Sequence, residues 1–173
     1  MTKQFKNIDI IIISGLSGSG KSVAIRALED VGFFCIDNLP IGLLDSLLKI
    51  VEAGQTPIER LALVMDTRDP RLIEEGKIRF ENMRRLRPNF TIVFLECSDD
   101  SLIRRFKEVR RKHPMSSDGS IISGISAERR MLAWIKSMAD VEIDTTDVKV
   151  TELRKELQDR FRDTGQEPTF HLT

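Results

Sequence analysis

Long apolar runs are missing from this sequence of 173 residues. A helix needs about 18–20 consecutive apolar residues to span a bilayer. The apolar stretch at residues 8–13 is far shorter than that and ends in a glycine-rich turn. The sequence therefore predicts neither a membrane anchor nor a signal peptide, and we expect a cytoplasmic protein with no membrane contact.

Cysteine and net charge are also scarce. The two cysteines, Cys35 and Cys97, fit neither a metal site nor a disulfide framework, so we expect small buried thiols. The 27 basic and 27 acidic side chains cancel. This balance argues against a surface built as a whole to grip nucleic acid, and it weakly favours a homo-oligomer. Aromatic and basic residues do not interleave as they do in proteins that bind single-stranded RNA.

Short apolar runs alternate with segments of helical periodicity along the whole chain. The length fits one domain over residues 1–173, with 40% hydrophobic and 31% charged residues. Strands are predicted at 8–14, 33–36, 61–65, 91–95 and 141–143. Helices are predicted at 24–31, 44–51, 71–86, 102–109, 127–138 and 150–161. This alternation predicts an α/β fold of the P-loop NTPase type, like a small kinase, with a five-stranded parallel sheet in the order 2-3-1-4-5 and helices on both faces.

A phosphate-binding loop follows the first predicted strand. It matches the pattern G-x-x-x-x-G-K-[ST] at every fixed position, with the residues Gly15, Leu16, Ser17, Gly18, Ser19, Gly20, Lys21 and Ser22. Glycines let the backbone turn its N–H groups toward an anion, and the following helix points its positive end at the same place. As the catalytic cation, Lys21 would reach the β and γ phosphates, and Ser22 would offer a hydroxyl to Mg²⁺.

Two acidic residues stand at the carboxyl ends of predicted strands, where parallel sheets bind ligands. Asp66 ends the strand 61–65 in a Walker B pattern, and Asp37 follows the strand 33–36. Each is a candidate ligand for Mg²⁺, directly or through water, and Asp66 could also polarise an attacking hydroxyl or water. The alternative for both is a carboxylate that caps the next helix or turn. No glutamate follows Asp66, so the dedicated water-activating carboxylate found in fast ATPases is not visible here. We therefore predict slow hydrolysis.

Basic residues gather on the helix 102–109 and just beyond it, before a Ser/Gly-rich segment at 115–124 that we expect to be a loop. They are Arg104, Arg105, Arg110, Arg111 and Lys112. Small P-loop kinases carry a lid at this place, and arginine beside a transferring phosphate stabilises the developing charge. We therefore predict that Arg104 and Arg110 contact the nucleotide, with a solvated helix face as the alternative. His113 is expected to be polar surface.

The region around the phosphate loop resembles a specific protein family. The loop runs into Ala-Leu-Glu-Asp-Val-Gly-Phe-Phe-Cys-Ile-Asp-Asn-Leu-Pro at residues 27–40, which looks like the amino-terminal domain of the RapZ/YvcJ family of bacterial nucleotide-binding proteins. Residues 102–106 and 110–114 match two further blocks. The segment that matches the family's D-x-R-[ND] motif, assigned to guanine nucleotides, is Asp66, Thr67, Arg68 and Asp69. Family members are longer, so the resemblance implies that this chain lacks their carboxyl-terminal domain.

The resemblance implies ATP and GTP binding with slow hydrolysis. In some members it also implies control of small-RNA decay by an RNase adapter, with RNA and a ribonuclease as partners of the full-length protein. Two other functions stay open from the residues alone. One is a small-molecule or nucleotide kinase, and the other is an RNA-binding module in which the P-loop acts only as a switch. Salt-dependent binding to structured RNA would favour the last.

Overall fold

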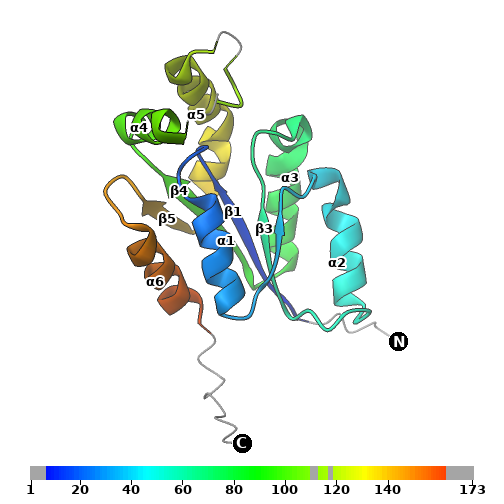
Figure 1. Cartoon of the computed structure of the whole chain (residues 1–173). Helices are drawn as coiled ribbons and strands as arrows, with labels where there is room; N and C mark the ends of the chain where they lie inside the picture. Colours follow the sequence, from blue (N-terminus) through cyan, green and yellow to red (C-terminus); the bar gives the residue numbers. More distant parts are fainter. Residues whose placement is uncertain (1–6, 110–112, 117–118, 163–173) are drawn as a thin grey trace, which may run out of the picture.

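Five strands and six α-helices make up the part of the chain that the computed structural model describes, residues 7–109, 113–116 and 119–162, and they alternate except that α4 and α5 follow each other (Figure 1). The strands are β1 (Asp9–Gly15), β2 (Phe34–Asp37), β3 (Arg60–Val64), β4 (Phe90–Glu96) and β5 (Val141–Asp144). The helices are α1 (Lys21–Asp30), α2 (Leu44–Glu52), α3 (Pro70–Leu86), α4 (Asp99–Val109), α5 (Ile121–Met138) and α6 (Val150–Phe161), with a short 3₁₀ turn, η1 (Ile41–Leu43), before α2.

All strand pairs of the sheet are parallel, and the order is β2-β3-β1-β4-β5. The central strand β1 pairs with β3 on one side, where Ile12 faces Leu63, and with β4 on the other, where Ile12 faces Ile92. The predicted order 2-3-1-4-5 is confirmed. The carboxyl ends of all five strands therefore meet at one edge of the sheet, where the loops after β1, β2 and β3 lie together.

Helices cover both faces of the sheet, as predicted (Figure 1). Successive side chains of a strand point to opposite faces. Ile11 and Ile13 pack with α1 and α6, whereas Ile10 and Ile12 pack with α2, α3 and α5. Because both sides of β1 are buried, its sequence reads as a continuous apolar run rather than as an alternating one.

Helix α5 begins at Ile121, six residues before the predicted start, so part of the expected loop 115–124 is helical. Ser120 caps the helix by accepting a hydrogen bond from the backbone N–H of Ser123. Serine and glycine suggested a loop because both are poor helix formers. Here Ser120 is the cap, and Gly124 is buried at a close contact with His113.

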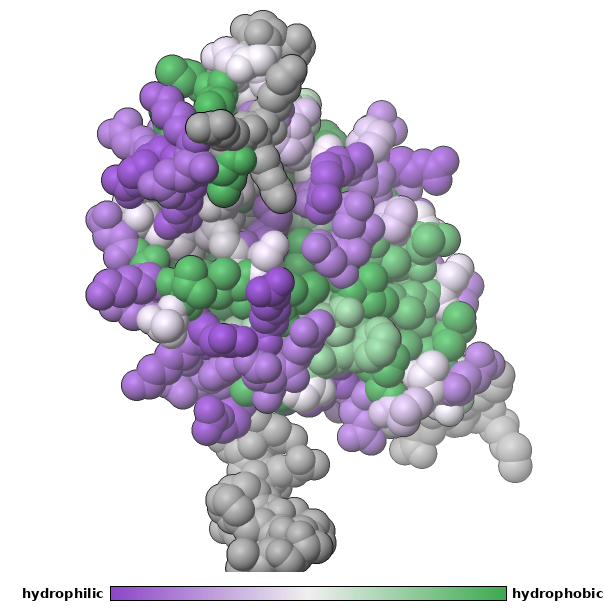
Figure 2. Space-filling view, viewed as in Figure 1, coloured by the Kyte–Doolittle hydropathy of each residue, from purple (hydrophilic) through white to green (hydrophobic). Residues whose placement is uncertain are grey.

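The surface differs between the two sides of the molecule. Polar residues dominate over α1 and α6, and apolar residues gather over β2 and α2 (Figure 2). Phe34 and Leu43 are more than half exposed there, and none of the described strands pairs with the outer edge of β2. Both cysteines are free thiols; Cys97 is buried, but Cys35, on β2, is only half-buried. Among the described residues, no helix is long and apolar enough to cross a bilayer.

Candidate functional site: the P-loop cavity

The loop between β1 and α1 has the backbone that a phosphate cradle requires. Gly18 and Gly20 have φ of 85° and 111°, in the left-handed region that favours glycine. At Gly15 a Cβ atom would come within 2.5 Å of the carbonyl oxygen of Leu95 on β4, so only glycine fits against that strand. Helix α1 begins at Lys21 and directs its positive end toward the loop.

Lys21 lies folded over the loop. Its Nζ donates hydrogen bonds to the carbonyl oxygens of Gly15 at 2.8 Å and Leu16 at 3.0 Å. Burial lowers the pKa of Lys21, and the negative charges of Glu128 and Asp66 oppose that effect. The ammonium group is therefore held in place by weak backbone acceptors that an incoming phosphate can replace.

A cavity of about 530 Å³ opens over the P-loop. Seven predicted residues line it: Ser17, Gly18, Lys21, Ser22, Asp37, Asp66 and Arg68. Helix α4 and the chain after it close the other side with Arg105, Phe106, Val109 and Pro114. The structure thus brings the P-loop together with the ends of β2 and β3, although these segments are far apart in sequence. Hydroxyl and carboxylate oxygens from Ser22, Asp37 and Asp66 are the donor types that fit Mg²⁺.

Asp66 and Arg68 form a tight pair inside this cavity. The Arg68 guanidinium donates to both carboxylate oxygens of Asp66 at 2.7–3.0 Å, and the Arg68 backbone N–H donates to one of them at 2.9 Å. Burial by itself would raise the pKa of Asp66, but the Arg68 hydrogen bonds and the Lys21 charge outweigh it and hold this pKa below its ordinary value. The same guanidinium lies 3.9 Å from Asp37, so it links both predicted acidic residues.

The Asp66–Arg68 pair makes stability depend on pH. Because the pKa of Asp66 in the folded chain lies below its ordinary value of 3.8, the pair stabilises the folded state above that pH. The contribution is lost as the pH falls through the folded-state pKa. We therefore expect the difference in Tm between the parent and Asp66→Asn to shrink when the pH is lowered from about 7 to about 3. A difference that stays constant over this range would show that the charge of Asp66 does not stabilise the fold.

Two members of the segment 66–69 do not line the cavity. Thr67 is buried and donates its hydroxyl to Glu128 at 3.1 Å. Asp69 caps α3 by accepting from the N–H of Arg71 at 3.0 Å, and it also accepts from the N–H of Ile41 at 2.7 Å. Of the four predicted residues, Asp66 and Arg68 line the cavity, and the other two connect neighbouring elements.

Of the two arginines on α4, one lines the cavity and the other does not. Arg104 is exposed and donates to Ser101 at 3.2 Å, outside the cavity lining. Arg105 lines the cavity and donates to the carbonyl oxygen of Gly18 at 2.9 Å. Leu102, Arg105 and Phe106 share one helix face, so the burial pattern could have selected Arg105. Arg110 lies outside the described residues.

Glu128 is the residue that the sequence analysis missed. It is fully buried on α5 and accepts hydrogen bonds from the backbone N–H and the hydroxyl of Ser17. A signal was present in the sequence, because Glu128 interrupts an apolar stripe of Ile125, Leu132 and Ile135 at helical spacing. His113, expected at the surface, is buried beside Glu128.

Sequence comparisons find one matching family model and several similar proteins. The family model of the RapZ-like N-terminal domain matches residues 8–165. A nucleotide-binding protein of Myxococcus xanthus is 47% identical over 152 residues, which are 88% of this chain and 52% of the relative. A nucleotide-binding protein of Symbiobacterium thermophilum is 38% identical over 167 residues, which are 96% of this chain and 55% of that relative. The chain thus spans about half the length of these curated relatives.

Solved structures with the same fold include two shikimate kinases. The enzyme of Acinetobacter baumannii, in complex with shikimate, has a TM-score of 0.57 at 12% identity, over 92% of this chain and 96% of that one. The enzyme of Bacteroides thetaiotaomicron has a TM-score of 0.53 at 15% identity, over 87% of this chain and 96% of that one. At these identities the likeness shows the fold alone, a P-loop fold of the small-kinase type.

Proposed function

Because the chain belongs to the RapZ-like N-terminal domain family, we propose that it binds a nucleoside triphosphate, ATP or GTP, over its P-loop and hydrolyses it slowly with Mg²⁺. One observation carries the proposal. Lys21, Ser22 and Asp66 come from two separate segments and line the same cavity. Together they supply a cation for the phosphates, a hydroxyl for the metal and a carboxylate for the metal or the attacking water.

The proposed hydrolysis is slow because Asp66 and Asp37 are the only carboxylates among the described residues that line the cavity, and Arg68 lies beside both. Thr67 follows Asp66 and binds Glu128, and both oxygens of Asp66 are engaged by Arg68. A base that is already paired is a weak proton acceptor. Turnover should therefore fall below the ~1–100 s⁻¹ typical of kinases.

Calorimetric titration with ATP and with GTP, each with Mg²⁺ and with a chelator, tests the binding. We expect saturable heats for both nucleotides and weaker binding when Mg²⁺ is removed. Within the segment 66–69, Arg68 is the residue proposed to contact the nucleotide, since it lines the cavity. Failure of both nucleotides to bind at concentrations up to about 1 mM would refute the proposal.

The regulatory role is proposed for the full-length protein. Relatives are about twice as long as this chain, and the family resemblance connects some members to small-RNA decay with a ribonuclease partner. We propose that this chain is the nucleotide-binding part of such an adapter. A full-length protein whose RNA affinity is the same with and without ATP would contradict that role.

A small-molecule kinase is the second candidate, favoured by the shape of the cavity. Beyond the P-loop, the cavity extends to Asp37 and Arg68 at the carboxyl ends of β2 and β3, which leaves polar groups beside the place for the γ phosphate. A screen of hydroxyl-bearing acceptors with labelled ATP separates the two functions. Transfer of label to an acceptor faster than to water would establish a kinase.

A further inference from the structure

The buried carboxylate of Glu128 joins three segments that surround the nucleotide cavity. Its Oε1 accepts from the backbone N–H of Ser17 at 2.5 Å, and its Oε2 accepts from the Ser17 hydroxyl at 2.7 Å. The hydroxyl of Thr67 donates to the same Oε2 at 3.1 Å. His113 Nε2 lies 3.4 Å from Oε1 but lacks hydrogen-bond geometry. A carboxylate has enough lone pairs for all these neighbours.

Each neighbour of Glu128 belongs to a different segment of the cavity wall. Ser17 lies in the P-loop, Thr67 stands between Asp66 and Arg68, and His113 directly precedes Pro114. Glu128 itself is fully buried and does not line the cavity. It therefore has no direct contact with a nucleotide in the cavity, and it acts through the segments that it holds and through its charge on Lys21.

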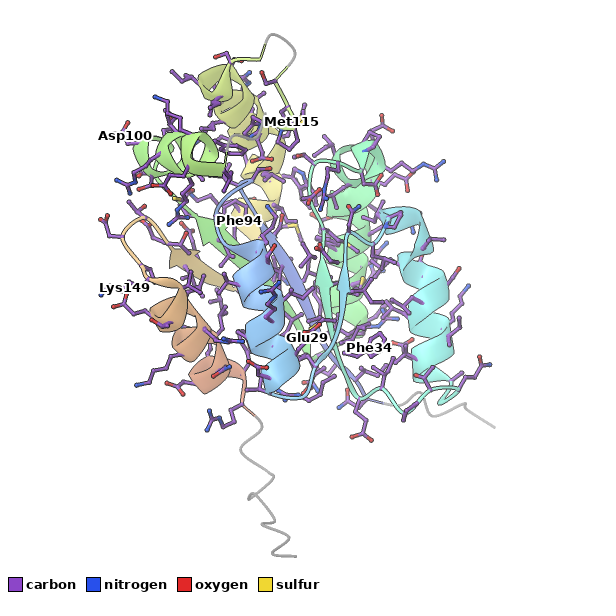
Figure 3. All side chains as sticks on the ribbon, in the orientation of Figure 1. Glu29, Phe34, Phe94, Asp100, Met115 and Lys149 are labelled. Atoms are coloured by element: carbon purple, nitrogen blue, oxygen red, sulfur yellow. The ribbon has the colours of Figure 1, made fainter. Side chains whose placement is uncertain are left out.

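The place of His113 beside Glu128 is closely fitted. A Cβ atom at Gly124 would come within 2.5 Å of His113 Nδ1, so the glycine one turn before Glu128 makes room for the ring. Nδ1 accepts from the backbone N–H of Met115 at 3.0 Å, which fixes the ring against the chain that follows it. Met115 is labelled in Figure 3, where it lies beside α5 at the carboxyl edge of the sheet.

We propose that Glu128 is a positioning residue that holds the P-loop and the segments around Thr67 and His113 in the arrangement that receives the nucleotide. A loop with Gly15, Gly18 and Gly20 loses much conformational entropy when it becomes ordered. Contacts that order such a loop before binding remove that cost from the binding step. The charge of Glu128 matters because hydrogen bonds to a carboxylate are stronger and shorter than those to an amide.

This inference rests on the proposed nucleotide site, and Glu128→Gln tests it with little change of shape. In the variant we expect the Kd for Mg-ATP to rise about tenfold, the effect of losing charge-assisted hydrogen bonds. We also expect faster amide hydrogen exchange at residues 15–22 of the unliganded protein. Glu156→Gln on α6 is the control, since Glu156 is exposed and pairs only with Arg160 among the described residues; it should change neither quantity.

Two further variants keep the test decisive if Glu128→Gln fails to fold. Ser17→Ala and Thr67→Val each remove one hydroxyl that donates to Glu128 and leave the carboxylate its other donors. Thr67 does not line the cavity. Weaker Mg-ATP binding in Thr67→Val, with faster exchange confined to the P-loop, would support the proposal. Folded variants with parental Kd and parental exchange in the P-loop would overturn it.

The two proposals fail in different ways. If the parent protein binds neither Mg-ATP nor Mg-GTP, nucleotide binding is refuted, and the exchange rates of the unliganded variants alone decide whether Glu128 holds the P-loop. If Glu128→Gln lowers the Tm and speeds exchange across the whole sheet while the affinity for Mg-ATP stays unchanged, Glu128 only stabilises the core. That result would reject positioning and leave nucleotide binding intact.

Discussion

Lys21→Ala is expected to weaken Mg-ATP binding by at least about thirtyfold and to abolish turnover. Loss of one partner of a desolvated charge pair costs about 2 kcal/mol or more, and about 1.4 kcal/mol corresponds to a factor of ten. Among the described residues that line the cavity, the other cations are engaged elsewhere, Arg68 in the pair with Asp66 and Arg105 in hydrogen bonds to both Gly18 and Thr145. Calorimetry and a phosphate-release assay measure the two effects.

The fold should survive the Lys21→Ala substitution. Among the described residues, Lys21 donates hydrogen bonds only to two backbone carbonyl oxygens of the loop, and its burial is already unfavourable for the charge. Lys49→Ala, at an exposed position near the end of α2, is the matched control and should bind like the parent. If folded Lys21→Ala protein binds Mg-ATP with the parental affinity, the cavity over the P-loop is not the nucleotide site.

The fold and the P-loop could be predicted from the sequence because each depends on local patterns. The run from Ile10 to Ile13 is apolar throughout since both faces of β1 are covered, and the fixed glycines of the P-loop follow from backbone conformations and close contacts that only glycine tolerates at low cost. The positions of Asp37 and Asp66 at one edge then follow from parallel pairing. Local sequence patterns and the rules of parallel sheets are therefore enough to predict the fold and the place of the P-loop.

Side-chain partners could not be predicted, because they depend on distant segments. Helical periodicity could place Arg105 on the buried face of α4, but its partner Gly18 depends on how α4 packs against the P-loop. Asp69 looked like a ligand contact, but η1 brings the N–H of Ile41 against it. The burial of Glu128 likewise requires Ser17 and Thr67, whose separations from it are 111 and 61 residues along the chain.

The exposure of the Asp66–Arg68 pair determines whether a substitution at Asp66 changes the rate of hydrolysis without unfolding the protein. The Asp66 side chain is only 7% exposed, whereas that of Arg68 is 50% exposed and can turn to solvent when its partner is neutral. Removing the charge of Asp66 therefore does not leave an unpaired cation in the interior, which is the costly outcome for buried pairs. Asp66→Asn should remain folded, and its effect on rate can be separated from its effect on stability.

Asp66→Asn is expected to lower Mg²⁺-dependent hydrolysis of ATP and GTP by about a hundredfold, the low end of what a positioned base contributes. The amide keeps the shape but can neither attract a divalent cation nor take a proton from water. Binding should change less than turnover, because Lys21 and the loop N–H groups remain. Initial rates across Mg²⁺ concentrations measure the effect, with Asp45→Asn as the control, since Asp45 also pairs with an arginine, Arg79, but at an exposed position. If the variant keeps the parental rates and the parental Mg²⁺ requirement, Asp66 serves only as the ion-pair partner of Arg68. Asp37, which lies 3.9 Å from the same guanidinium, would then become the candidate ligand for the metal.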